Sequence, residues 1–489
     1  MSLLQPTDFN IVCAVLGGFV SLFGLVSYFI KERLFLSEAL IALLVGIGLG
    51  PHGANLIRPL DYASGSPERV DAITLAFTRL VLGVQLVLAG VQLPKMYLFH
   101  QRRSLGVLLG PAMLLKWGVS SVLVRLLVPG AGWITALATA ACITPTDPIL
   151  ANNIVKGQFA DAHIPPRLQQ LITAESGAND GLGYPFLFAA LHTLKYVAIG
   201  PGGARAAAAQ WLGETVCYVV LLSVVYGAAV GWVAKELLHF AEKRKLVDRE
   251  SFLVFAIALA LLIVGTCGML GSDDVLACFV AGNIFTLDDW FRLETMDDSL
   301  QPTVDMLLNM SVFLWFGAAC PWRTFARIPT ARLLLLAAAV ILLRRPPVVL
   351  ALRRWIPNVQ STREALFAGY FGPIGVSAIF YLLLTQEFLG DLERHAGVEE
   401  LRHLITPVVW MCVITSVVVH GITIPFIMLG NAVPDSIGIV RFPSWNVRRR
   451  QQRRTAKASG GEENALLNAD DDEEAAAGTA GYGAVAVRG

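Results

Sequence analysis

The chain has 489 residues, of which 55% are hydrophobic and 15% are charged, whereas a typical soluble domain is about 25% charged. Together with a mean hydropathy of +0.61, this composition excludes an ordinary water-soluble globular domain. The formal net charge of +1 says little about partners, because the distribution of charge among loops, and not the total, orients a membrane protein. No nucleic-acid partner is expected.

The apolar residues are gathered in blocks of about 18 to 25 residues, the length that a helix needs to cross roughly 30 Å of hydrocarbon. About thirteen such blocks follow one another, so the predicted fold class is an all-α polytopic membrane protein embedded in a lipid bilayer. The second and ninth blocks are short. The predicted spans are residues 9–30, 36–49, 72–93, 105–128, 134–155, 168–194, 211–232, 251–270, 275–287, 304–320, 333–352, 364–384 and 404–429.

Basic residues fall mainly in alternate loops, on the same side of the predicted membrane as the basic stretch 448–454. Because cytoplasmic loops are enriched in lysine and arginine, this side is predicted to be cytoplasmic. From residue 433 the chain becomes polar, with an acidic run at 470–474. We therefore expect a transmembrane domain over residues 1–432 and a cytoplasmic tail over residues 433–489, whose composition is typical of disorder.

Two predicted spans, in similar places in the two halves of the chain, contain helix-breaking residues. These are Pro145 and Pro148 in the fifth span, and Gly372, Pro373 and Gly375 in the twelfth. Proline removes a backbone donor and clashes with the preceding turn, so each helix should unwind there. Unwound backbone at membrane depth persists only inside protein or beside a water-filled cavity. Paired broken helices of this kind indicate a secondary transporter built from inverted repeats.

Buried acids mark the candidate ion site, because a carboxylate at mid-membrane costs at least ~2.5 kcal/mol. Asp147 lies between the two prolines of the fifth span, and Asp180 lies well inside the sixth. Oxygen ligands suit a hard cation such as Na⁺, and freed carbonyls near Thr144 and Thr146 could complete its shell. The alternatives are that Asp147 is the N-cap of the second half-helix and that Asp180 is a protonated structural acid.

A single buried acid can couple two ions. A carboxyl group that must hold either a proton or a cation links their opposite movements, which is the chemistry of antiport. Asn179 is neutral, and its amide could orient Asp180 or coordinate the ion. We therefore predict a Na⁺ site at Asp180.

Three further acids lie in or beside predicted spans. Glu175, five residues before Asp180, needs a cation at that depth. Arg344 and Arg345 in the eleventh span offer one. We predict a structural salt bridge between Glu175 and Arg345, with a place on the ion path as the alternative for Glu175. Asp273 and Asp274 lie between the eighth and ninth spans. They form either an ion vestibule or a solvated loop that caps the next helix.

These residues also resemble a known family. The segments TPTDP at 144–148 and ESGAND at 175–180 resemble the cation/proton antiporter superfamily, in its monovalent cation:proton antiporter 1 type. Further segments resemble the alkali-cation/proton antiporters of the yeast and mould plasma membrane. They are LSEAL at 36–40, GPH at 50–52, RPLD at 58–61, DRESF at 248–252 and FGPIG at 371–375. The resemblance extends over nearly all of the chain to about residue 434.

The resemblance implies the sodium/proton antiporter fold, with inverted repeats and two crossing broken helices, and a scaffold domain that forms a homodimer. It also assigns roles to individual positions. The matched positions are Asp180 as the cation- and proton-binding acid, Asn179 as its partner, Thr144 and Asp147 as broken-helix contacts, Glu175 with Arg345 as the internal salt bridge, and Asp273 with Asp274 as auxiliary acids of the fungal branch.

The implied function is secondary active antiport by alternating access. Cytoplasmic Na⁺, and also Li⁺ or K⁺, would be exchanged for external H⁺ across the plasma membrane, contributing to salt tolerance and to cation and pH homeostasis. No cofactor and no enzymatic activity are implied.

Three other functions could use the same buried acids. An ion channel is one, but broken helices in both halves favour alternating access over a continuous pore. An intramembrane aspartyl protease could use Asp147 and Asp180 as a catalytic pair, but the sequence lacks a Gly-x-Gly-Asp segment. A cation sensor that does not transport is the third, although the tail after residue 432 is short.

Overall fold

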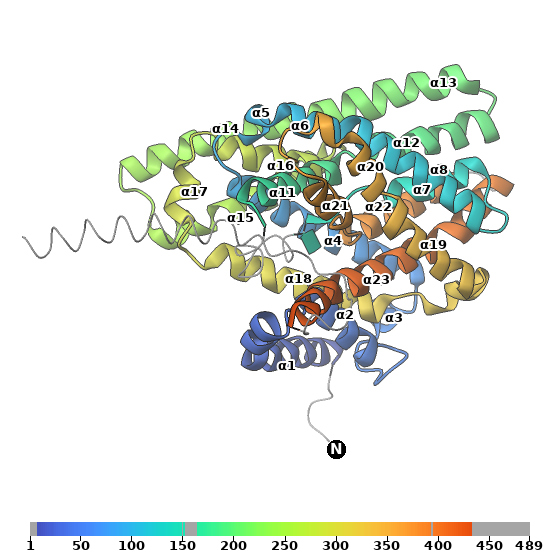
Figure 1. The fold of residues 1–489 in the computed structure, drawn as a ribbon, viewed down its shortest axis with the longest axis horizontal. Coiled ribbons are helices and arrows are strands. Elements are labelled where there is room, and N and C mark those ends of the chain that lie inside the picture. The colour runs from blue at the N-terminus through green and yellow to red at the C-terminus, as the bar shows by residue number, and fades with distance from the viewer. Residues whose placement is uncertain (1–6, 149, 152–163, 393–394, 433–489) are drawn as a thin grey trace, which may run out of the picture.

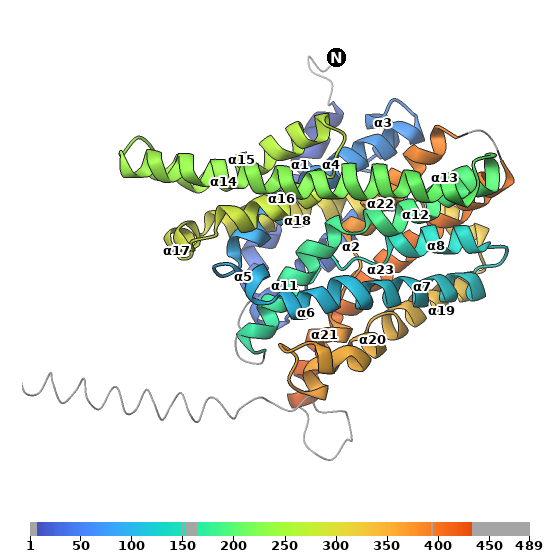
Figure 2. The ribbon, with the colours of Figure 1, turned by 90° about the horizontal axis from the view of Figure 1, so that it is seen from above.

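The computed structural model describes residues 7–148, 150–151, 164–392 and 395–432. Within these ranges every regular element is a helix. Within the described residues, eight helical stretches, several of them made of adjoining elements, are long and apolar enough to cross a membrane, and four shorter apolar helices accompany them. Figures 1 and 2 show the helices packed side by side in one bundle, with α1 (Asp8–Tyr28) at its edge in Figure 1. The predicted tail, residues 433–489, lies outside the described residues.

The first half of the chain runs from α1 to the long helix that ends at Lys243. Its further elements are η1 (Phe29–Arg33), α2 (Glu38–Leu49), α3 (Pro59–Tyr62), α4 (Pro67–Gln92), α5 (Tyr97–His100), α6 (Arg102–Val107), η2 (Leu108–Ala112), α7 (Met113–Leu127), α8 (Trp133–Cys142), α11 (Pro166–Gly181), α12 (Tyr184–Thr193), η3 (Leu194–Ile199), α13 (Gly203–Gln210), η4 (Trp211–Leu221) and α14 (Leu222–Lys243).

The second half is likewise made of long helices joined by short connections. Its elements are α15 (Arg249–Met269), α16 (Asp274–Phe285), α17 (Trp290–Thr295), α18 (Leu300–Ala319), η5 (Trp322–Arg327), α19 (Thr330–Leu343), α20 (Pro346–Leu352), η6 (Arg353–Trp355), α21 (Thr362–Tyr370), α22 (Val376–Gly390) and α23 (Ala396–Ala432).

Each of the predicted spans coincides with one or more of these helices, so the predicted fold class is confirmed. The short second and ninth spans are present as α2 and α16. In the fifth span, α8 ends at Cys142, and the part predicted at residue 149 and over residues 152–155 lies outside the described residues. In the twelfth span, α21 and α22 are separate helices, with non-helical backbone over residues 371–375.

The sixth span differs from the prediction of one continuous helix over 168–194. It consists of α11 and α12, which are separated at Leu182 and Gly183. Pro185 explains the interruption, because it has no N–H to donate to the carbonyl of Gly181, four residues earlier, and its ring would crowd that carbonyl. The break therefore falls directly after Asp180.

Small residues allow the helices that surround the site to pack backbone against backbone. A Cβ at Gly46 of α2 would overlap the main chain of α18 at Leu314, and one at Gly317 of α18 would overlap α2. Helices in lipid gain stability from such close van der Waals packing, because hydrocarbon supplies no hydrophobic drive between them. In the same way α16 packs against both α4 and α14 (Figure 2).

Candidate functional site

The two interrupted spans meet in the interior of the bundle. After α8 ends, residues 143–147 are non-helical, as expected from Pro145 and Pro148. The Asp147 N–H donates to the carbonyl of Pro373, in the interruption between α21 and α22, at 3.0 Å. Each break leaves N–H or C=O groups at its helix ends without a partner in their own helix. The helix ends of the two breaks therefore lie close together.

Asp147 satisfies two of the freed N–H groups. Its Oδ1 accepts from the Leu150 N–H at 3.0 Å, and its Oδ2 accepts from the Val376 N–H, the first residue of α22. A Cβ on Gly375 would overlap this carboxylate, so the close approach depends on glycine. A negative charge at the positive ends of half-helices is favourable. The N-cap interpretation of Asp147 thus describes its present contacts.

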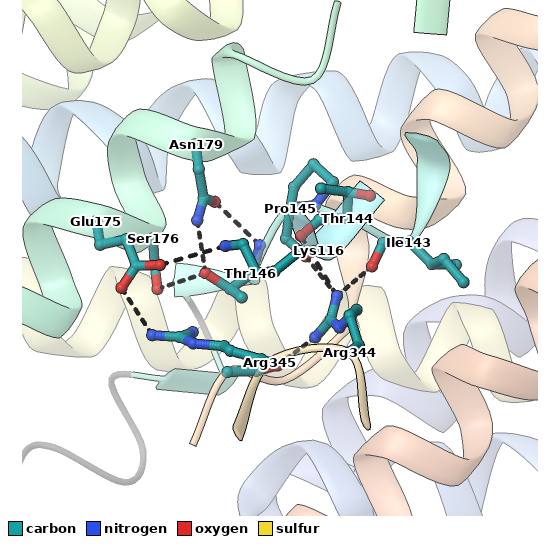
Figure 3. A network of polar contacts seen from close by, with 11 residues as sticks. Lys116, Ile143, Thr144, Pro145, Thr146, Glu175, Ser176, Asn179, Arg344 and Arg345 are labelled. Carbon is teal, nitrogen blue, oxygen red and sulfur yellow. Dashed lines mark hydrogen bonds and ion pairs between the residues drawn. The ribbon is translucent and has the colours of Figure 1, made fainter. Parts of the chain in front are cut away.

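Arg344 complements Asp147 at the opposite helix ends. Its Nη1 donates to the carbonyl of Ile143, with longer contacts to those of Thr144 at 3.4 Å and Pro145 at 3.3 Å. Its Nη2 donates to the carbonyl of Gly372 in the other break. Figure 3 shows the guanidinium among the carbonyls that follow α8. A positive charge therefore faces the negative ends of both interrupted helices.

Glu175 on α11 lies between two cations. Its Oε2 accepts from Arg345 Nη2 at 2.7 Å, and its Oε1 lies 3.3 Å from Lys116 Nζ on α7. All three side chains are buried. The pairing of Glu175 with Arg345 was predicted from the sequence, whereas that with Lys116 was not, although a lysine in the middle of an apolar span requires a partner.

Asn179 holds the broken helix through Thr146. Its Nδ2 donates to Thr146 Oγ1 at 2.8 Å, and its Oδ1 accepts from the Thr146 N–H at 3.0 Å. The Thr146 hydroxyl also contacts Ser176 Oγ at 3.1 Å (Figure 3). The Thr144 hydroxyl donates back to the carbonyl of Ala140 at 2.7 Å. The Asn179 amide thus orients Thr146 in this structure, where the sequence suggested contact with Asp180 or an ion.

Among the described buried acids of this site, Asp180 is the one for which neither carboxyl oxygen has a hydrogen-bond partner. It is fully buried, and the Ser377 side chain at the start of α22 approaches its carboxyl group. Neither carboxyl oxygen completes a hydrogen bond of normal geometry within the described part of the chain. Asp147 and Asp273 are close enough to act on its charge. A buried carboxyl group without hydrogen bonds is more stable with a proton or a cation bound than as a carboxylate without a counter-ion.

Tyr381 on α22 stabilises the backbone beside Asp180. Its hydroxyl donates to the Asp180 carbonyl, with a longer contact of 3.4 Å to the carbonyl of Gly181, which Pro185 leaves without a helical partner. Tyr381 was not predicted, because the sequence around a tyrosine in an apolar span does not indicate what its hydroxyl contacts across the bundle.

Asp273 and Asp274 are both buried, so the solvated-loop alternative is wrong. Its N-cap part is correct, because Asp273 Oδ1 accepts from the Leu276 N–H at 2.9 Å at the start of α16. Asp274 forms an ion pair with Arg79 on α4, with 2.6 Å between Oδ2 and Nε. Arg79, like Lys116, is a cation whose partner was not predicted from the sequence.

Interrupted helices that meet around buried acids, in a bundle of apolar spans, define the chain as a multi-pass membrane protein with an ion-transport architecture. A family model described as "Sodium/hydrogen exchanger, transmembrane" matches residues 18–430. The chain belongs to the sodium/hydrogen exchanger family. This is a family of transporters and not of enzymes, which removes the protease alternative.

Several fungal proteins are similar over most of the chain. A Na⁺/H⁺ antiporter of Saccharomyces cerevisiae is 38% identical over 448 residues, which are 88% of this chain and 44% of that protein. Na⁺/H⁺ antiporter 2 of Zygosaccharomyces rouxii is 35% identical, over 88% of this chain and 54% of that protein. A Na⁺/H⁺ antiporter of Schizosaccharomyces pombe is 30% identical, over 86% and 90%. The chain thus spans about half the length of the first two relatives.

The fold is also similar to a solved structure. The sodium proton antiporter MjNhaP1 from Methanocaldococcus jannaschii, determined at pH 8, aligns with a TM-score of 0.62 at 20% sequence identity. The alignment covers 86% of this chain and 99% of the archaeal protein. This likeness establishes the fold.

Proposed function

We propose that the chain is a Na⁺/H⁺ antiporter in which Asp180 binds the cation and the proton alternately. The observation that carries the proposal is that the buried Asp180 carboxyl oxygens lack hydrogen bonds of normal geometry among the described residues, whereas the neighbouring Glu175 and Asp147 are held by fixed cations or helix ends. An acid with a permanent partner gains less from an ion than an acid without one, so Asp147 can add an oxygen ligand but cannot be the principal one. Binding of either a proton or a cation neutralises the buried Asp180 carboxylate, and the two ions exclude one another at this single charge.

The surrounding residues support this role by keeping the interruption open. Asp147 and Arg344 satisfy the helix ends, so the unwound backbone persists in the membrane interior without water. Asn179 and Thr146 tie the interruption to α11, which carries Asp180. The ligand shell that we propose for Na⁺ combines Asp180 with oxygens of Thr144, Thr146 and Asp147, with Asn179 contributing through its contact to Thr146.

The finer features of this function rest on the resemblance to fungal antiporters. We propose that the protein moves Na⁺, together with Li⁺ or K⁺, out of the cytoplasm in exchange for external H⁺. We further propose a plasma-membrane location, a cytoplasmic tail and a homodimer. Alternating access of Asp180 to the two sides provides the coupling. An empty site would leave the Asp180 carboxylate as an uncompensated charge in the membrane interior, which is costly, so the site returns only with a cation or a proton bound.

The test uses purified protein in liposomes with an imposed pH gradient, monitored by an internal pH-sensitive dye. Addition of Na⁺ should dissipate the gradient for the native protein and for Asp297→Asn, an exposed acid that serves as the matched control. Asp180→Asn should insert normally and give no exchange. Near-native exchange by Asp180→Asn would contradict the proposed site, and Na⁺ flux without proton movement would indicate a channel.

A further inference from the structure

The start of α16 contains an ion pair whose two members are exposed to very different degrees. Asp274 is 1% exposed at its side chain, whereas its partner Arg79 is 37% exposed. A half-exposed guanidinium in a membrane span must reach water, headgroups or a polar cavity, because contact with hydrocarbon is costly. Arg79 therefore indicates a polar opening beside α4, α15 and α16.

The position of the Arg79 guanidinium depends on a glycine of α15. A Cβ on Gly268 would overlap Nη2 of Arg79 and would lie 3.8 Å from Oδ2 of Asp274. Gly265, one turn earlier on the same helix, has nothing within 4 Å of a Cβ among the described residues. The ion pair therefore requires a residue without a side chain at position 268, whereas position 265 can accept one.

The two adjacent acids have unequal partners. Asp274 is neutralised by Arg79 at 2.6 Å, whereas Oδ2 of the fully buried Asp273 makes no hydrogen bond within the described ranges. Arg79 therefore leaves one of the two acids, and not both, open to a mobile ion.

Two tyrosines connect this acid pair with Asp180. The rings of Tyr184 and Tyr381 lie edge to face, with centroids 5.5 Å apart. Tyr184 is within electrostatic range of Asp273 and Asp274, and the Tyr381 hydroxyl bonds to the Asp180 carbonyl. Tyr184 and Tyr381 are thus the side chains that link the surroundings of the acid pair to the backbone of Asp180.

We propose that Arg79 is a positioning residue for ion entry: by pairing permanently with Asp274, it makes Asp273 the single open acid between this opening and Asp180, and so sets the apparent affinity for the cation. The inference rests on the proposed antiport function and deepens it. The proposed role of Arg79 is to decide which acid is available to ions, and it is separate from any contribution of Arg79 to folding of the bundle.

The groups around Asp274 leave Arg79 as its counter-charge. Among the described residues, the titratable side chains within electrostatic range of it are Asp273, which caps α16, Cys278 of α16, Cys267 of α15, Tyr184 of α12 and Arg79 of α4. Thiols and phenols are neutral near pH 7. When Arg79 is removed, Asp274 becomes a second open acid, which attracts a cation at alkaline pH and takes up a proton at acid pH.

The experiment measures Na⁺-dependent exchange in liposomes from pH 6 to pH 9, separating KM from kcat. Arg79→Gln should lower the KM for Na⁺ by about threefold or more at the alkaline end, as expected for one additional charge near the path, and the difference should shrink as the pH falls. Addition of Asp274→Asn should remove the effect. Arg79→Lys should retain the native KM for Na⁺. Gly268→Ala should shift the KM in the same direction as Arg79→Gln. Gly265→Ala, on the same helix, is the control for Gly268→Ala and should leave the KM unchanged.

The outcomes separate this inference from the proposed function. If the native protein exchanges Na⁺ but Arg79→Gln keeps the native KM at every pH, or shifts it equally with and without Asp274→Asn, the role of Arg79 is wrong while antiport stands. If Arg79→Gln does not reach the membrane, recovery of the Arg79→Gln/Asp274→Asn double variant supports the pairing. No recovery, together with a native KM in Gly268→Ala, overturns it.

Discussion

Replacing Glu175 by glutamine should destabilise the protein more than replacing either of its partners. Glu175 divides its two oxygens between Arg345 at 2.7 Å and Lys116 at 3.3 Å. Its loss leaves two buried cations facing each other. Loss of one partner still leaves the carboxylate with the other.

The magnitude follows from the cost of an uncompensated buried charge. Breaking a buried ion pair costs about 3 to 5 kcal/mol, and Glu175→Gln should fall at the upper end of that range. Arg345→Ala and Lys116→Met should each cost less, because one ion pair remains in both variants.

Double variants sharpen the prediction, because lysine and arginine differ chemically. A buried lysine can release its proton and become neutral, whereas arginine stays charged. Glu175→Gln combined with Arg345→Ala leaves only Lys116, so partial rescue is expected. Glu175→Gln combined with Lys116→Met leaves Arg345 charged and alone, so no rescue is expected.

The assay is thermal unfolding of detergent-purified variants, followed by size-exclusion chromatography with fluorescence detection. Coupling energies come from the two double-mutant cycles. Equal stability of the two double variants, or the absence of coupling between Glu175 and both partners, would show that the cluster does not act as a charge-compensated unit.

Three further predictions follow from the site and its flanking loops. Protons and Na⁺ should compete at Asp180, so the KM for Na⁺ should rise up to about tenfold per pH unit in the acidic range; a constant KM with a changing maximal rate would indicate separate sites. Gly375→Ala should impair exchange because its Cβ would overlap a carboxylate, whereas Gly390→Ala, in open space among the described residues, should not; equal activity of the two would refute the packing argument. Hydrogen bonds from Ser251 lower the pKa of Asp248 outside the span. Its contribution to stability should therefore be present above the ordinary carboxyl pKa and vanish as the pH falls, so Asp248→Ala should lower the melting temperature at pH 7 but not in acid.

The sequence alone determined the fold class, because the length of an apolar block and the spacing of helix breakers are local properties. Thirty ångströms of hydrocarbon require about twenty apolar residues, so the spans could be read directly. Pro145, Pro148, Gly372 and Pro373 likewise marked the interruptions, since the chemistry of proline and glycine is the same in any fold. The break after Asp180 was overlooked, although Pro185 was visible in the sequence, and so was the interruption at Arg344 and Arg345 in the predicted eleventh span.

The partners of the buried charges were decided only by the tertiary structure. Lys116 and Arg79 lie 59 and 195 residues from the acids that they meet. Ion pairing acts through space, and one sequence does not specify which of several charged side chains will come within a few ångströms. The structure assigned Arg344 to the freed carbonyls and Asn179 to Thr146 because packing of α7, α11, α19 and α20 fixes their relative positions. It thereby left Asp180 with open oxygens, which no local pattern could have indicated.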